Sequence, residues 1–203
     1  MIPKIKYAFF GLLLFVPACG AISALDTASQ PLEIYELRSP DVQSTVRRGG
    51  TELVIEEPSA SGALATERIM IQPGPLQAQY LPGVRWADTA PKMLQTLILR
   101  SITQTGALGS VGRRPVGTIA DYAVLSELTD FQAETRPDAR GADVVVRISF
   151  RIVRERDARV IATRTFEQSA RADDTRTGTL VAAFDQATSQ LATDAVPWIL
   201  SQL

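Results

Sequence analysis

The 203-residue sequence contains no histidine and only one cysteine, Cys19. Without histidine, the chain lacks the side chain that most often serves as a general base and as a neutral metal ligand. A single cysteine excludes an intramolecular disulfide and the clustered cysteines of zinc sites. Lysine is scarce as well, because Lys92 is the only one that follows Lys4 and Lys6. A Ser–Lys nucleophile pair therefore has one candidate, at a predicted helix start where capping and dipole effects already account for polar residues.

The charge pattern and the missing motifs argue against most enzyme and nucleic-acid-binding classes. The net charge is −1, so the chain has no electrostatic footprint for nucleic acid. There is no Walker loop, no GxGxxG and no GxSxG. A glycosidase needs two carboxylates facing across a cleft, whereas the acidic residues are scattered on predicted strands and turns. We therefore predict no catalytic residue, no metal and no cofactor, and a hydrolase that depends on Lys92 is the enzyme alternative.

The N-terminal segment has the pattern of a bacterial lipoprotein signal peptide. Lys4 and Lys6 form a positive region, and the apolar run from Tyr7 to Val16 is too short to span a membrane stably. The run ends in Val16-Pro17-Ala18-Cys19, which resembles a lipobox. An ordinary secretory signal, cut at an Ala-x-Ala-like site with an incidental Cys19, is the alternative. Lipidation explains best why the only cysteine stands at the end of the signal.

Lipidation of Cys19 would anchor the chain to a membrane. Each buried methylene of an acyl chain contributes about 0.8 kcal/mol, so several chains would hold the protein on a bilayer almost permanently. Gly20 is not the aspartate that signals inner-membrane retention in many Gram-negative bacteria. The pattern thus favours the periplasmic side of the outer membrane over the inner membrane. We divide the chain into a signal peptide (1–18), a lipidated tether (19–31) and a folded domain (32–203).

A well-marked helix organises the middle of the domain. Asp88 or Thr89 can cap its start, and Pro91 suits the first turn, where its missing N–H is no loss. Gly106 is the expected left-handed stop. The apolar residues between these ends recur at helical spacing: Met93, Leu94, Leu97, Ile98 and Ile102.

The entrance of this helix, Arg85-Trp86-Ala87-Asp88, has two interpretations. In the structural one, Trp86 fills the core and an Arg85–Asp88 ion pair fixes the turn. In the functional one, Arg85, Trp86 and Asp88 bind a partner, since Trp and Arg are common interface anchors. We expect the structural outcome for Trp86 and an exposed side chain for Arg85.

The remaining pattern predicts one α/β domain, in which helices pack on a mixed, largely antiparallel sheet. Alternating segments predict a hairpin of two long strands, preceded by another long strand, and a final apolar helix begins at Thr177 or Thr179. Pro197 should bend this helix or separate its last turns. The expected strands are 33–37, 52–57, 67–71, 77–81, 119–134, 142–155 and 159–172, with loops or turns at 39–50 and 108–117, and a loop or a short helix at 59–65.

Several short motifs together resemble the ABC-type transport auxiliary lipoproteins. They are the lipobox, Tyr35-Glu36-Leu37, Arg68-Ile69, Tyr80, Arg85-Trp86-Ala87-Asp88, Met93-Leu94, Asp121-Tyr122 and Val181-Ala182-Ala183-Phe184. The resemblance implies a domain like the anticodon-binding or TolB N-terminal fold. It also implies a non-enzymatic lipoprotein subunit of an envelope lipid-transport complex, whose partners are an MCE-domain protein, an ABC permease and an ATPase. A free-standing periplasmic scaffold lipoprotein is the alternative, and homo-oligomer formation stays open.

Overall fold

The computed structural model describes residues 32–114, 120–138 and 140–203 of the chain. The predicted signal peptide, the tether and Cys19 lie outside the described residues. The three described ranges belong to one unit, Leu32–Leu203.

Three long antiparallel strands form one side of the sheet, with β10 at its edge. The strand β9 lies between β8 and β10, and its even-numbered residues from Val144 to Ile152 are buried while the alternate residues are partly exposed. The left-handed residue Ala158 (φ 52°) closes the turn between β9 and β10. This confirms the predicted hairpin. The bounds are β8 (Tyr122–Thr135), β9 (Ala142–Arg154), a 3-10 turn η1 (Glu155–Asp157) and β10 (Arg159–Ala172).

Shorter strands extend the sheet beyond β8 and make it mixed. The strand β2 lies between β8 and β7 and is parallel to both, while β3 and β4 also pair in parallel with β8. The antiparallel strands β4 and β5 form a hairpin, and β1 and β6 make a separate parallel pair. The bounds are β1 (Glu33–Tyr35), β2 (Arg48–Ile55), β3 (Ser59–Ala60), β4 (Met70–Gly74), β5 (Gln77–Tyr80), β6 (Val84–Trp86) and β7 (Leu108–Gly112).

Two loop predictions are wrong because strand pairing is non-local. Residues 108–112 form β7 instead of a turn, and Arg48 starts β2 inside the predicted loop. The two strands meet at Arg48 and Leu108, where a Cβ on Gly109 would lie 2.3 Å from the Gly49 carbonyl oxygen. Glycine permits this close backbone approach, so the glycines that suggested turns allow a strand pair.

Helix α2 (Ala90–Thr105) has the predicted ends, with a different capping contact. Thr89 is the N-cap residue but its side chain makes no capping bond. Instead, the Asp88 carboxylate accepts a hydrogen bond from the Thr89 backbone N–H at 2.8 Å. Gly106 ends the helix in the left-handed conformation (φ 59°), as predicted.

Helix α3 (Thr177–Gln202) continues through Pro197, so the predicted separation of its last turns is wrong. Val196, Ile199 and Leu200 are all fully buried around the proline. Burial of this apolar face stabilises the last turns despite the backbone hydrogen bond that proline cannot donate.

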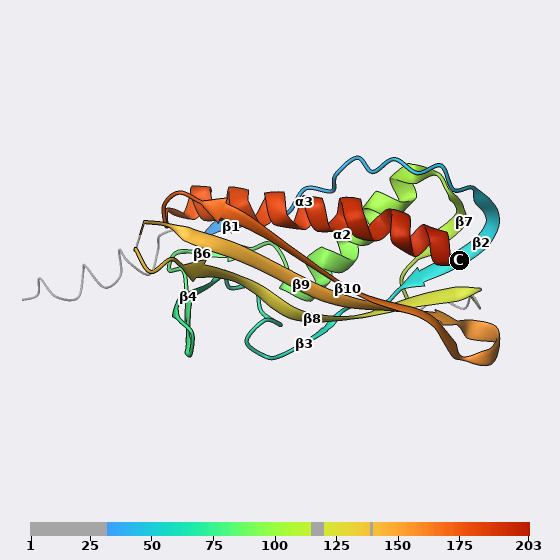
Figure 1. Ribbon diagram of the computed structural model, residues 1–203, viewed down its shortest axis with the longest axis horizontal. Coiled ribbons are helices and arrows are strands. Elements are labelled where there is room, and N and C mark those ends of the chain that lie inside the picture. Colours follow the sequence, from blue (N-terminus) through green and yellow to red (C-terminus); the bar gives the residue numbers. More distant parts are fainter. Residues whose placement is uncertain (1–31, 115–119, 139) are drawn as a thin grey trace, which may run out of the picture. The chain divides into compact units, whose positions relative to one another are not determined.

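The core lies between the sheet and the two helices. Figure 1 shows α3 lying along β8, β9 and β10, with α2 beside it. Three aromatic rings meet there from β6, β8 and α3: the Trp86 centroid is 5.3 Å from that of Phe184 and 5.8 Å from that of Phe131. Two motifs far apart in the sequence, around Trp86 and Phe184, therefore contact each other in the core.

Candidate functional site

Two adjoining polar pockets lie along the N-terminal half of α2, with volumes of about 310 and 360 Å³. Both are lined by Asp88, Thr96 and Arg113, so we treat them as one surface, the α2 groove. Its charged lining residues are Glu36, Glu56, Glu57, Asp88, Lys92, Arg100, Arg113 and Arg114.

The floor of the α2 groove is a polar stripe on one face of the helix. Asp88, Lys92, Thr96 and Arg100 follow one another at intervals of four residues, which places them one above the other. The Lys92 Nζ atom lies 3.6 Å from the Asp88 carboxylate. The other face of α2 is buried in the core, and the helix is therefore held with the stripe toward solvent.

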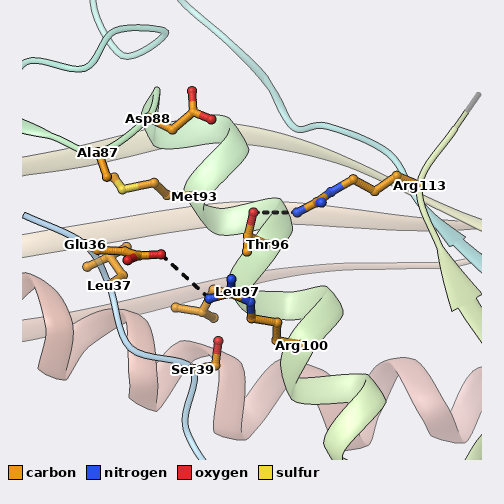
Figure 2. A pocket seen from close by; sticks show the side chains of 10 residues that line it. All are labelled: Glu36, Leu37, Ser39, Ala87, Asp88, Met93, Thr96, Leu97, Arg100 and Arg113. Atoms are coloured by element: carbon orange, nitrogen blue, oxygen red, sulfur yellow. Dashed lines mark hydrogen bonds and ion pairs between the residues drawn. The ribbon is translucent and has the colours of Figure 1, made fainter.

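Arg113, just after β7, crosses over this stripe. Its Nε donates to Gln95 Oε1 at 3.0 Å. Its Nη2 donates to Thr96 Oγ1 at 2.5 Å, the bond drawn in Figure 2. Gln95 is itself buried, and its Nε2 donates to the Ile55 carbonyl at 2.8 Å. Arg113 is thus positioned by a hydrogen-bond chain that links α2 to the end of β2.

Ion pairs form the two walls of the groove. Arg100 lies 3.7 Å from the Glu36 carboxylate in the segment after β1, the pair drawn in Figure 2. At the other wall, Arg114 pairs with both Glu56 and Glu155. Exposed pairs of this kind contribute only about 0–1 kcal/mol, so an incoming charged partner can replace them at little cost.

The wall that carries Glu36 is fixed to α3 through Arg38. The Asp185 carboxylate accepts hydrogen bonds at 2.9 Å from both the Arg38 backbone N–H and its Nε. This hydrogen bonding raises the pKa of the Arg38 guanidinium above its usual value. Because Asp185 directly follows Phe184, the same turn of α3 packs the core and holds this wall.

The structure separates the three residues predicted at the helix entrance. Trp86 is 0% exposed, and its buried Nε1 has no hydrogen-bond partner within the described residues. Arg85 pairs with Glu67, so the predicted Arg85–Asp88 ion pair is wrong. Alternation along β6 turns Arg85 away from the core side occupied by Trp86, whereas Asp88 lies beside Lys92.

Of the three, only Asp88 lines the α2 groove, and Trp86 has the structural role. Partner binding by Arg85, Trp86 and Asp88 stays a prediction. Sequence reasoning missed Glu36, Arg100, Arg113 and Arg114. The four-residue spacing from Asp88 to Arg100 was the available signal for the stripe. No local signal marks Arg113 and Arg114, because the long-range pairing of β7 brings them to the groove.

The groove has the chemistry of a surface for charged ligands. Acidic and basic side chains are interspersed along the α2 groove, which favours charge-assisted hydrogen bonds to the side chains of another protein. Within the described ranges, no three His, Cys, Asp or Glu side chains lie close enough to hold a metal ion. No helix in the described part of the chain is long and apolar enough to cross a membrane.

The molecule is a single α/β domain in which a mixed sheet carries two helices, which confirms the predicted fold class. A crystal structure of protein XCC0632 from Xanthomonas campestris has the same fold, with a TM-score of 0.77 and 25% identity over 83% of this chain and 95% of that one. The hypothetical protein CT253 from Chlamydia trachomatis shares the fold at 10% identity, with a TM-score of 0.51 over 75% of this chain and 97% of that one.

The chain belongs to the family of ABC-type transport auxiliary lipoprotein components, whose model matches residues 35–196. The protein bll6063 of Bradyrhizobium diazoefficiens is 30% identical over 172 residues, which cover 81% of this chain. The match spans 44% of that relative's length. The predicted family is therefore confirmed.

Proposed function

We propose that this chain is a non-enzymatic lipoprotein subunit of an ABC/MCE-type intermembrane lipid-transport complex. In this proposal, Cys19 is acylated and holds the domain on the periplasmic side of the outer membrane. The domain then binds the periplasmic part of an assembly made of an MCE-domain protein, an ABC permease and an ATPase. The observation that carries the proposal is the family match over residues 35–196.

The α2 groove supports a role in protein binding. Its lining alternates carboxylates with guanidinium and ammonium groups, an arrangement that suits the charged surface of a protein better than an acyl chain, which needs apolar surroundings. Lys92 and Arg100 have side chains that are 51% and 57% exposed. Both therefore reach solvent from a rigid helix, as an interface anchor must.

Co-purification from detergent-solubilised envelopes tests this proposal. The double variant Lys92→Glu/Arg100→Glu should lose the MCE protein, permease and ATPase from the wild-type eluate, because it reverses the sign of the stripe. The matched control is Arg171→Glu, whose side chain is 68% exposed on β10 and which should retain them. Melting temperatures of all variants should agree within a few degrees.

The results would count against separate parts of the proposal. Unchanged capture by the double variant would exclude the groove as the docking surface, and other envelope proteins in the wild-type eluate would favour the scaffold alternative. The intact mass of the mature protein reports the anchor independently. An unmodified Cys19, or a Cys19→Ser chain processed like wild type and still held in the membrane, would contradict lipidation.

A further inference from the structure

The β4–β5 hairpin presents an uncharged surface with a fully exposed leucine at its tip. Leu76 is 102% exposed, the highest value among the large apolar side chains of the described residues. Gly74 pairs with Gln77, so Pro75 and Leu76 form the tip. In Figure 1 the hairpin, at the label β4, projects from the sheet on the side away from α3. Nothing in the hydrophobic core requires Leu76.

The charge pattern around the tip is unusual for this chain. No charged residue occurs from Ile69 to Val84, although 21% of all residues are charged. No charge within the hairpin itself has to be desolvated when the tip leaves water, and the charged side chains Glu134 and Arg136 line a pocket beside Gln72 to Pro75. Arg68 and Arg85 flank the uncharged segment directly, so the charges stand at its two ends.

The base of the hairpin has the residues that favour a membrane interface. The Arg68 guanidinium lies 4.0 Å from the centroid of the Tyr80 ring, and the Tyr80 hydroxyl donates to the Ala63 carbonyl at 3.1 Å. Tyrosine and arginine prefer the headgroup level, where an apolar body meets a polar layer. The apolar leucine at the tip therefore suits the acyl region of one leaflet, and the Tyr–Arg pair at the base suits its headgroup layer.

The hairpin base also adjoins the start of the described chain. The Glu33 backbone N–H donates to the Gly83 carbonyl at 3.1 Å, and the Leu81 N–H donates to the Ile69 carbonyl at 3.0 Å. Leu32 and Ile34, which are 55% and 56% exposed, flank this junction. Exposed apolar side chains thus gather where the chain arrives from Cys19.

We propose that the tip of the β4–β5 hairpin inserts into the bilayer that carries the lipid anchor, with Leu76 entering the acyl region. This proposal rests on the proposed anchoring of the chain to a membrane. The tether of residues 19–31 spans at most about 45 Å when fully extended. It would keep the hairpin near the bilayer, and insertion would fix the orientation of the domain on the surface. The α2 groove would then face a defined direction.

A single fluorophore at the tip tests insertion. Acylation blocks the only native cysteine, so Leu76→Cys in the lipidated protein provides a unique site for an NBD label. In vesicles of phosphatidylethanolamine and phosphatidylglycerol, the emission should shift to the blue and be quenched by lipids with a doxyl group on the acyl chain. Ala78→Cys, on β5, should show a smaller shift.

Val160→Cys is the matched control. Val160 is 51% exposed, near the β9–β10 turn at the opposite end of the sheet from β4 (Figure 1). Its label should stay in water and escape the doxyl quencher. A label at Leu76 that stays aqueous would overturn the proposal, even if a protein partner later covers the tip. Equal shifts at Leu76 and Val160 would overturn it as well, because they would report a domain lying unspecifically on the surface.

A second arm separates this proposal from lipidation. The mature chain with Cys19→Ser and an N-terminal hexahistidine tag can be held on vesicles that contain a nickel-chelating lipid, because the natural sequence has no histidine. The same labels should then give the same pattern. Insertion in this arm, together with an unmodified Cys19 in the natural protein, would refute the anchor alone. Absence of insertion in this arm would refute the hairpin proposal.

Discussion

Replacing Trp86 with alanine should lower the free energy of unfolding by about 3–5 kcal/mol, the usual loss for a large buried aromatic side chain. Trp86 is 0% exposed and packs edge-on against Phe184, with ring centroids 5.3 Å apart. Its contact with Phe131, at 5.8 Å, would be lost as well. Because three elements supply these rings, no single shift can refill the cavity.

A phenylalanine at the same position provides a graded control. The Trp86 Nε1–H is buried and unpartnered within the described residues, and such a group costs about 1–3 kcal/mol. Trp86→Phe removes this penalty and keeps one aromatic ring, so we expect it to cost less than about 2 kcal/mol. The smaller effect of Phe would show that the ring contacts, and not the indole N–H, stabilise the core.

Thermal melting of the mature chain followed by near-UV circular dichroism measures both variants. For a domain of this size, 3–5 kcal/mol corresponds to a fall of about 6–20 °C in Tm. Co-purification of transporter subunits should be recorded on the same Trp86→Ala sample below its Tm. A variant that melts like wild type but binds its partners more weakly, by about 2 kcal/mol or more, would refute the structural role of Trp86.

Two further substitutions test the loop anchor and the β8–β9 turn. Asp185→Asn should raise amide hydrogen exchange in residues 37–47 more than elsewhere, because it weakens the contacts that hold Arg38; uniform exchange would contradict this anchor. Gly141→Ala should lower the free energy of unfolding by at least about 2 kcal/mol, since Gly141 has φ +105° and a Cβ would lie 2.2 Å from the Ala172 carbonyl oxygen. The control is Gly62→Ala, because a Cβ added there meets no atom within 4 Å. Its free energy of unfolding should stay within about 0.5 kcal/mol of the wild-type value. Equal effects of the two alanines in a denaturant titration would refute the argument.

Elements governed by local rules could be predicted from the sequence. Pro91 and Gly106 mark the ends of α2 through backbone preferences that need no tertiary partner. The β9–β10 hairpin was equally accessible, because alternation over long adjacent segments leaves one pairing that buries most of the apolar residues.

Elements that depend on distant segments could not be predicted. A bulge between Leu128 and Asp130 shifts the register of β8, so alternation fails in its second half and Phe131 and Ala133 become buried. Likewise, β7 exists only because β2 approaches it in parallel. Arg113 reaches the α2 groove through that pairing, and its glycine-containing surroundings predict only a turn.

The family motifs contribute aromatic residues to the core, and Glu36 and Asp88 from the same motifs also line the groove. Trp86 and Phe184 lie in the motifs that made the resemblance specific, yet both are buried against each other. Large aromatic contacts of this kind constrain sequence strongly because few side chains fill the same volume. These two motifs therefore report how the core is packed. They predict the fold of the domain better than they predict its binding partner.

The groove contributes little to the stability of the fold, since exposed ion pairs such as Arg100–Glu36 are weak. Asp88 combines several roles, because it belongs to a family motif, accepts a hydrogen bond from the Thr89 N–H at the helix start and lines the groove. Loss of partner binding in Asp88→Asn, which keeps a helix-start acceptor, would hence indicate a charge contact, whereas loss only in Asp88→Ala would indicate positioning of α2.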